Sequence, residues 1–214
     1  MPHQSNIPAF DSDGYLPEGL HSASEPEVVF RFGASTRRRR WLALRLRQWI
    51  ELSRQVGARR LAVDGSFVTA KAEPNDVDVI VLLPPDFQVK IEKGLEPALE
   101  LDEMLSTRRP EEIFAAEDES DWNEWIEFFS RTGEARWSAQ RTRGGRAMIS
   151  NLTEYAKAEE EIRVLEERLS RLRLSHPVGS KGFTKAGIRK MIARLHEELA
   201  VFEGSEEARR PVTS

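Results

Sequence analysis

The sequence contains no cysteine among its 214 residues. This absence excludes a disulfide framework, a thiol nucleophile and any metal site built on thiolates. The chain also lacks a run of about 18 apolar residues, so it predicts no membrane-spanning helix. Its first residues lack the basic and apolar regions of a secretory signal. We therefore expect a cytoplasmic protein with no membrane association.

Histidine is scarce, and an excess of basic charge is absent. The four histidines are scattered, and no two of them have the spacing of metal ligands. The 32 basic residues are outnumbered by 36 acidic ones, giving a net charge of −4, which is unfavourable for general binding of polyanions. Residues 37–40 are four arginines in a row. They are either a solvated start of a helix, which we favour, or a local clamp for nucleic acid.

Apolar residues recur with helical and strand periods along residues 1–149, and five Trp and ten Phe supply material for a core. Residues 1–35 are rich in Gly and Pro and predict an irregular lead-in, with a short strand at 28–32. Further strands are predicted at 61–64, 77–83, 111–116 and 147–149. Helices are predicted at 36–56 and at 87–106, the second with a break at Pro97. A third helix is predicted to begin at Asp121, which would cap it. The predicted fold class is α+β, with a small mixed sheet and flanking helices.

The last third of the chain has a different pattern. Between residues 153 and 174 the apolar positions alternate in steps of three and four, and the same steps recur between 188 and 202. Such steps are typical of a coiled-coil seam. A short segment with Pro and Gly separates the two seams. We therefore predict an antiparallel helical hairpin at 150–204, a flexible tail at 205–214, and a separate domain at 1–149.

The most informative group of residues is Gly65-Ser66 followed, nine residues later, by Asp76-Val77-Asp78. Side chains alternate along a strand, so residues 76 and 78 are expected on one face. Two carboxylates in an apolar strand repel each other, and a divalent cation such as Mg²⁺ relieves this repulsion. Gly65 allows a close approach of backbone to an anion, and Ser66 carries a hydroxyl for a phosphate oxygen. The pattern predicts a site for metal ions and a triphosphate.

The segment DGSFVTAKAEPNDVDVIVLL resembles the signature of the polymerase-beta-type nucleotidyltransferase superfamily. With the flanking segments IPAFDSDGYLPEGLH, EVVFRFG and RRRW, residues 7–149 resemble a family of small bacterial nucleotidyltransferase-like proteins. Some relatives of this fold belong to toxin–antitoxin or phage-defence systems. The resemblance therefore implies a nucleotidyltransferase core in this chain.

The resemblance also implies roles for individual residues. Gly65 and Ser66 would hold nucleotide phosphates, while Asp76 and Asp78 would bind Mg²⁺ or Mn²⁺ and act as catalytic carboxylates. Active members add a third carboxylate on a later strand, and here Glu112 is the first candidate and Glu117 the second. Two residues of the intervening loop are further candidates for contact with phosphate: Thr69 and Lys71.

Two kinds of function follow from these expectations. The first is a metal-dependent nucleotidyltransferase that moves a nucleoside monophosphate from an NTP to a hydroxyl of an RNA 3′ end or of a protein, in a toxin–antitoxin or phage-defence role. The alternative is a catalytically inactive regulator that keeps the fold and binds nucleotide or a partner. The hairpin at 150–204 could bind a cognate toxin or antitoxin, mediate self-association, or simply complete the core.

Overall fold

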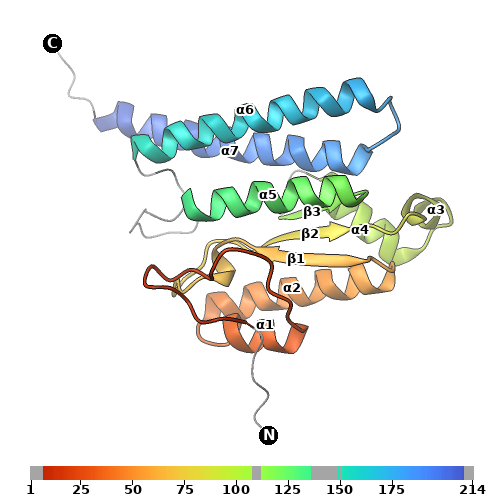
Figure 1. Cartoon of the computed structure of the whole chain (residues 1–214), viewed down its shortest axis with the longest axis horizontal. Helices are drawn as coiled ribbons and strands as arrows, with labels where there is room; N and C mark the ends of the chain where they lie inside the picture. The colour runs from red at the N-terminus through yellow and green to blue at the C-terminus, as the bar shows by residue number, and fades with distance from the viewer. Residues whose placement is uncertain (1–6, 108–111, 136–148, 150, 210–214) are drawn as a thin grey trace, which may run out of the picture. The chain divides into compact units, whose positions relative to one another are not determined.

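The computed structural model describes residues 7–107, 112–135, 149 and 151–209. The chain divides into two units, Met1–Ser130 and Arg131–Ser214, which are described separately (Figure 1). The described residues form a mixed α+β structure with a three-stranded sheet and seven α-helices. The predicted α+β class with C-terminal helices is thus confirmed. The predicted domain boundary at 149–150 follows residues 136–148, which lie outside the described part of the chain.

A small mixed sheet forms the centre of the first unit. Its strands are β1 (Arg60–Asp64), β2 (Asp78–Leu82) and β3 (Ile113–Ala116), in the order β1-β2-β3. The middle strand, β2, is antiparallel to β1 and parallel to β3. All five residues of β2 are buried, as its continuous apolar run predicts for a strand covered on both faces. The three strands confirm the predictions at 61–64, 77–83 and 111–116.

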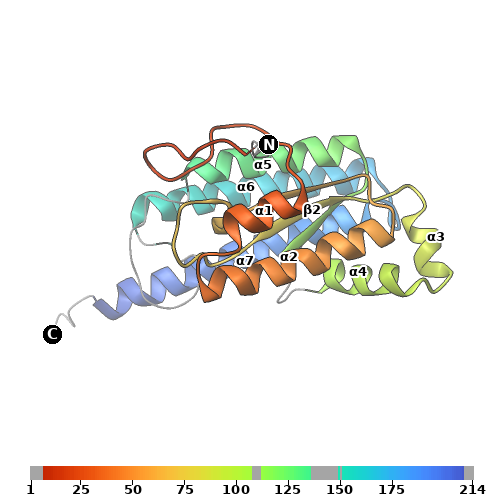
Figure 2. The ribbon, with the colours of Figure 1, turned by 90° about the horizontal axis from the view of Figure 1, so that it is seen from below.

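Helices cover both faces of this sheet. The helices α1 (Glu25–Phe32) and α2 (Arg37–Gln55) lie on one face, and the start of α5 (Glu119–Ala135) lies on the other (Figures 1 and 2). The apolar stripe of α2 that faces the core contains the buried residues Leu42, Leu46 and Trp49. On the opposite face, the indole N–H of Trp125 donates to the Ala115 carbonyl at 3.0 Å, which fixes α5 against β3.

The connection from β2 to β3 is helical, as predicted, and it is interrupted. It consists of α3 (Phe87–Glu92) and α4 (Glu96–Ser106). The break lies at Gly94, whose φ of +70° suits glycine, while Pro97 sits in the first turn of α4, where its missing N–H has no helical partner to lose. Gly57, with φ of +74°, follows the end of α2, where a positive φ favours glycine.

Two predictions are wrong, one about the type of an element and one about where a helix begins. Residues 28–32 belong to helix α1 and not to a strand, because Ser24 and Glu27 form a capping box that starts a helix. Helix α5 begins two residues before Asp121, because the side chain of Asp118 accepts the N–H of Asp121 at 3.0 Å. Of the strand predicted at 147–149, two residues lie outside the described part of the chain, and Ile149 is not in a strand.

The second unit contains the predicted helical hairpin, α6 (Leu152–Ser175) and α7 (Gly182–Arg209). The two helices run in opposite directions and pack along their length (Figure 1). Most apolar residues of the two predicted seams are buried, among them Leu165, Leu195 and Leu199, while Tyr155 and Ile192 are half-buried. Helix α7 continues past the predicted end at residue 204. No helix in the described ranges is both long and apolar enough to cross a bilayer.

Candidate functional site

The candidate site is centred on Gly65, which links β1 to a short 3₁₀ helix, η1 (Ser66–Val68). Gly65 has φ of 79° and ψ of −175°, a combination that only glycine adopts without strain. A Cβ at this position would lie 3.1 Å from Oδ1 of Asp76 and 3.2 Å from Oδ2 of Asp78. It would also lie 3.0 Å from the backbone nitrogen of Asp78. The two carboxylates predicted from the sequence therefore converge on the predicted glycine.

Both of these carboxylates are removed from solvent. Asp76 is 4% exposed and Asp78 is 2% exposed. Asp78 is the first residue of β2, but Asp76 precedes the strand, so the prediction that strand alternation alone aligns them is wrong. What places Asp76 is a set of hydrogen bonds across the loop: its Oδ1 accepts the backbone N–H of Ser66 at 2.8 Å and the Ser66 hydroxyl at 2.7 Å. Burial of a carboxylate is costly without such donors.

The hydroxyl of Ser66 is the centre of this loop. It donates to Asp76 and also accepts the backbone N–H groups of Asn75 at 2.7 Å and Asp76 at 3.1 Å. Because the Ser66 side chain is fully buried, its hydroxyl orients Asp76 and does not face an incoming phosphate. Thr69 is also turned inward, since its hydroxyl donates to the Ser66 carbonyl at 2.9 Å and accepts the N–H of Lys71 at 3.2 Å.

Lys71 is the basic residue of this loop whose pKa depends on the charge of Asp76. Burial lowers the pKa of Lys71 below its ordinary value, and the negative charge of Asp76 acts in the opposite direction. Lys71 as a whole is half-buried. Of the residues predicted to contact phosphate, Lys71 is the one whose side chain carries a charge suited to that contact.

Two more carboxylates lie at the end of the sheet that carries Asp78. Asp64, the last residue of β1, is the direct partner of Asp78 in the antiparallel register. Glu112 comes immediately before β3, and its carbonyl accepts the N–H of Val79 at 2.9 Å. Because Val79 is level with Ile113, Glu112 lies at the end of the sheet at which Asp78 begins β2. Residues that are level in adjacent strands share a face of the sheet.

The second candidate for the third carboxylate lies elsewhere. Glu117 follows the other end of β3, and its N–H donates to the Asp121 side chain at 3.1 Å. The structure thus brings Glu112 to the end of the sheet that carries Asp78 and leaves Glu117 at the opposite end. Asp64 is a residue that the sequence analysis missed, although it directly precedes Gly65 and ends a predicted strand.

Two arginines from the start of α2 hold the loop that carries Ser66 and Asp76. Arg39 is buried, and its guanidinium donates to the carbonyls of Phe67 at 2.8 Å, Thr69 at 2.6 Å and Lys71 at 3.2 Å. Burial lowers the pKa of Arg39 from its ordinary value, and Glu73 opposes this shift. A signal for this role exists in the sequence, because Arg39 precedes buried Leu42 by three residues on the same helical stripe.

Arg38 holds the other arm of the same loop. Its Nε donates to the carbonyl of Pro74 at 3.0 Å, and its terminal nitrogen donates to the carbonyl of Asn75. The loop between Gly65 and Asp76 is therefore tied to α2 on both arms. Positions 38 and 39 of the arginine run are structural, which corrects the prediction of a solvated helix start for these two residues.

A divalent metal ion needs several oxygen or nitrogen ligands from the site. Over the described ranges, no three His, Cys, Asp or Glu side chains are grouped so that they alone could hold a metal ion. Two buried carboxylates that converge on a glycine are instead suited to Mg²⁺, which commonly takes one or two carboxylates and completes its shell with water and phosphate oxygens. The residues present therefore fit an ion that binds together with a phosphate-bearing ligand.

A family model, described as a family of unknown function (DUF6932), matches residues 8–148. Because the match covers more than half of the chain, this chain belongs to the DUF6932 family. The matched range contains the whole candidate site, whereas α6 and α7 lie outside it. No curated protein and no solved structure matches the chain.

Proposed function

We propose that this member of the DUF6932 family is a cytoplasmic, metal-dependent nucleotidyltransferase whose mixed sheet is a nucleotidyltransferase core. It would move a nucleoside monophosphate from an NTP to a hydroxyl acceptor, an RNA 3′ end or a protein side chain. The observation that carries the proposal is the convergence of two buried carboxylates, Asp76 and Asp78, on the left-handed Gly65. Two carboxylates held this close repel each other, and a bound divalent cation would relieve that repulsion.

Asp76 and Asp78 would hold Mg²⁺ or Mn²⁺ together with the phosphates of the NTP. When bound, the ion supplies positive charge that neutralises the triphosphate and the developing charge at phosphorus. The donor set is too small for a cage made of protein alone, so we expect metal and nucleotide to bind cooperatively. Lys71, whose pKa burial lowers against the opposing effect of the Asp76 charge, would supply a further positive charge.

The reaction itself needs few protein groups. The acceptor oxygen forms a bond to the α-phosphorus, the bond from that phosphorus to the pyrophosphate oxygen breaks, and pyrophosphate leaves. The proton of the acceptor hydroxyl passes to a carboxylate at the same end of the sheet, for which Glu112 is the candidate. Ser66 keeps Asp76 in place throughout, and Gly65 leaves the approach free of a side chain.

The decisive experiment measures transfer of label from α-labelled NTPs to RNA or protein in cell extract, with Mg²⁺ or Mn²⁺. Wild type is run beside Asp76→Asn and Asp78→Asn, which remove the charge and keep the side-chain shape. Glu103→Gln, at an exposed position on α4, is the matched control. We expect transfer with wild type and the control and none with the two Asn variants. Equal transfer by all four proteins would contradict the proposal.

A second candidate is a non-catalytic regulator that binds nucleotide. It is favoured by the lack, among the described residues, of any three acidic or histidine side chains that could together hold a metal ion. The two candidates differ in a simple pair of measurements. The melting temperature of a regulator rises with Mg²⁺ and an NTP, but a regulator releases no pyrophosphate. The melting temperature of a transferase rises in the same way, and a transferase also releases pyrophosphate.

A role in a toxin–antitoxin or phage-defence system would need a partner surface, and the α6–α7 hairpin is our candidate for it. It lies outside the family match, and Leu174 and Val178 near its tip are fully exposed. The hairpin could bind a cognate toxin or antitoxin or mediate self-association. Light scattering of wild type and of a Leu174→Ser, Val178→Ser variant tests self-association, which predicts a larger mass for wild type.

A further inference from the structure

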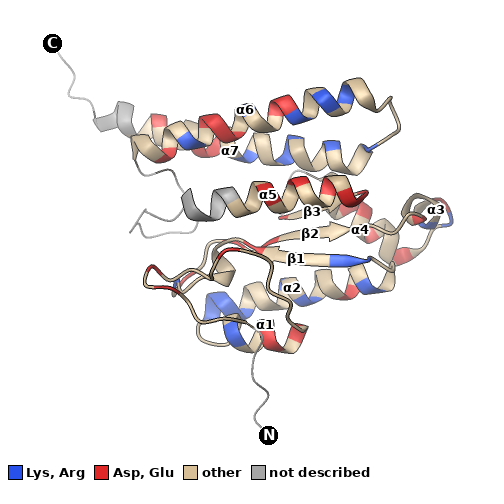
Figure 3. Ribbon diagram, viewed as in Figure 1, with Lys and Arg blue, Asp and Glu red and all other residues tan. Residues whose placement is uncertain are grey.

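The exposed surface at the start of α2 is basic and carries an exposed aromatic ring. We call it the α2 basic surface, formed by Arg37, Arg38, Arg40, Trp41 and Arg45. Arg37 and Arg40 are exposed, and Trp41 is 46% exposed. Figure 3 shows the first turn of α2 as a block of basic residues. No acidic residue occurs in that first turn.

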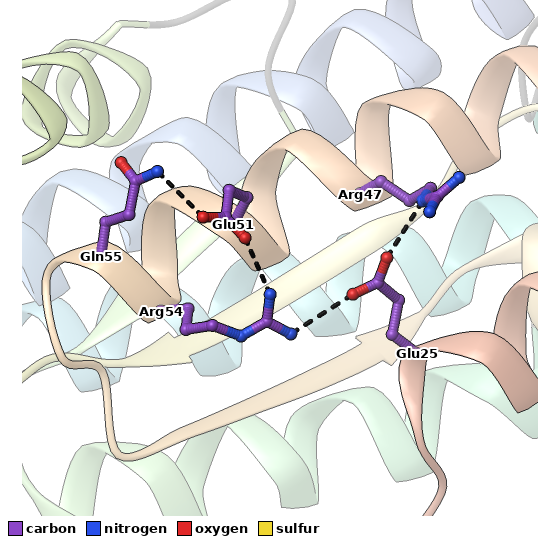
Figure 4. A network of polar contacts seen from close by, with 5 residues as sticks. All are labelled: Glu25, Arg47, Glu51, Arg54 and Gln55. Atoms are coloured by element: carbon purple, nitrogen blue, oxygen red, sulfur yellow. Dashed lines mark hydrogen bonds and ion pairs between the residues drawn. The ribbon is translucent and has the colours of Figure 1, made fainter.

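The arginines in the two halves of α2 differ in whether they pair with carboxylates. In the second half, Arg47 pairs with Glu25 at 3.0 Å, and Arg54 pairs with Glu25 at 3.3 Å and with Glu51 at 2.8 Å (Figure 4). Those arginines are neutralised by the protein itself, and they attach α1 to α2. In the described part of the chain, neither Arg37 nor Arg40 is paired with a carboxylate, and the Arg40 guanidinium donates to the Ala34 carbonyl at 3.0 Å. Their charge remains available to an anionic partner.

Planar groups are stacked on this surface. The guanidinium of Arg38 lies 4.8 Å from the ring centroid of Trp41, and that of Arg45 lies 4.9 Å from it. Unpaired nucleobases stack on aromatic rings and on guanidinium planes, whereas an acidic peptide needs charge alone. Positive charge combined with the exposed ring of Trp41 and the guanidinium groups of the half-buried arginines beside it therefore favours single-stranded nucleic acid over an acidic protein.

The same surface adjoins the candidate site. Arg38, stacked on Trp41, also donates to the carbonyls of Pro74 and Asn75, and Asn75 directly precedes Asp76. The Arg38 side chain thus contacts both the Trp41 ring and the segment that leads into Asp76. A strand lying on the α2 basic surface would have its end close to Asp76.

We propose that the α2 basic surface binds single-stranded RNA, with Arg37 and Arg40 on its phosphates and the Arg38–Trp41–Arg45 stack against its bases. The choice of RNA over DNA and its identification as the acceptor rest on the proposed function, but the binding of a single strand by this surface does not. The bound strand would present its 3′ hydroxyl at the end of the sheet that carries Asp76 and Asp78. This surface would then decide that the acceptor is RNA and not a protein hydroxyl.

The test is fluorescence anisotropy with a labelled, unstructured RNA of about ten nucleotides, a length within the usual site size of single-strand binders. It uses the full chain without NTP. The variant Arg37→Glu/Arg40→Glu is compared with Arg173→Glu/Arg189→Glu, which makes the same charge change at two exposed arginines of the hairpin. We expect the α2 variant to bind at least tenfold more weakly and to lower the slope of log K against log salt by about 1.4, as two lost phosphate contacts require. The hairpin variant should bind like wild type.

Trp41→Ala separates stacking from charge. We expect it to weaken binding roughly fivefold or more without changing the salt slope. Melting temperatures of all variants are measured alongside, so that a loss of folding is recognised. Equal weakening by the hairpin variant, absence of RNA binding at low salt, or tighter binding of an acidic peptide than of RNA would each overturn the proposal.

Failure of the surface and failure of the transferase are distinguishable. RNA binding that depends on Arg37 and Arg40, without any label transfer, would contradict the proposed reaction and support the proposed RNA-binding surface. Label transfer that is unchanged in the Arg37→Glu/Arg40→Glu variant would contradict the proposed surface and support the proposed reaction.

Discussion

Substitution of Gly65 by alanine tests the geometry on which the candidate site depends. The backbone at Gly65 has φ of 79° and ψ of −175°, and holding a non-glycine residue there costs on the order of 1–3 kcal/mol. The new methyl group would also meet three atoms of Asp76 and Asp78 at 3.0–3.2 Å. One of the three is a backbone nitrogen of β2, which cannot move without disturbing the sheet. Crowding of this kind adds about 1–3 kcal/mol.

A matched control exists in the same unit. Gly94 also has a positive φ, +70°, and a Cβ added there would meet nothing within 4 Å. Gly94→Ala therefore reports the cost of a positive φ without crowding, while Gly65→Ala adds the strain of ψ near 180° and the crowding of the carboxylates. We expect Gly65→Ala to lower the free energy of unfolding by about 1–3 kcal/mol more than Gly94→Ala does.

Urea unfolding followed by tryptophan fluorescence measures both variants, with unchanged m-values as the sign that the two-state comparison is valid. A second readout is the rise in melting temperature given by Mg²⁺ with an NTP, which Gly65→Ala should lose and Gly94→Ala should keep. If the two variants are equally destabilised and both retain the nucleotide effect, then the carboxylates do not converge on Gly65 as described.

Three other substitutions test the groups around the site. Ser66→Ala leaves the N–H of Asn75 and the buried Asp76 short of a hydrogen bond, and we expect urea unfolding to show a loss of about 1–3 kcal/mol; no loss would mean that the hydroxyl does not hold the loop. Arg39→Met removes the donor to several loop carbonyls and should lower the free energy of unfolding by about 3 kcal/mol. A smaller decrease than that caused by Arg40→Met would contradict the role of Arg39 in holding the loop. Burial, aided by two nearby aspartates, raises the pKa of Tyr15 to about 12. The contribution of Tyr15 to stability is thus complete below pH 10 and is lost as the pH rises towards 12, so Tyr15→Phe should flatten the decline in stability over that range; an unchanged decline would contradict the shift.

The sequence by itself determined the local elements and the main members of the site. Periodicity is a property of adjacent residues, so α2, the three strands and the two hairpin helices follow from it. The acidic pair at 76 and 78 was also recognisable, because acidic residues are unusual beside a continuous apolar run. The glycine at 65 was recognisable because Gly65-Ser66 lies nine residues before that pair. The start of α1 was recognisable in principle from the capping box at Ser24 and Glu27.

Only the tertiary structure decided how these residues meet. Strand register is set by pairing between segments far apart in the chain, and it alone puts Asp64 opposite Asp78 and Glu112, not Glu117, at the same end of the sheet. Burial decided the roles of the arginines, because a guanidinium under a loop can satisfy several carbonyls that no local pattern identifies. The same residue type therefore braces the site at position 39 and stays exposed at position 40, since the helix turns one side chain inward and the next outward.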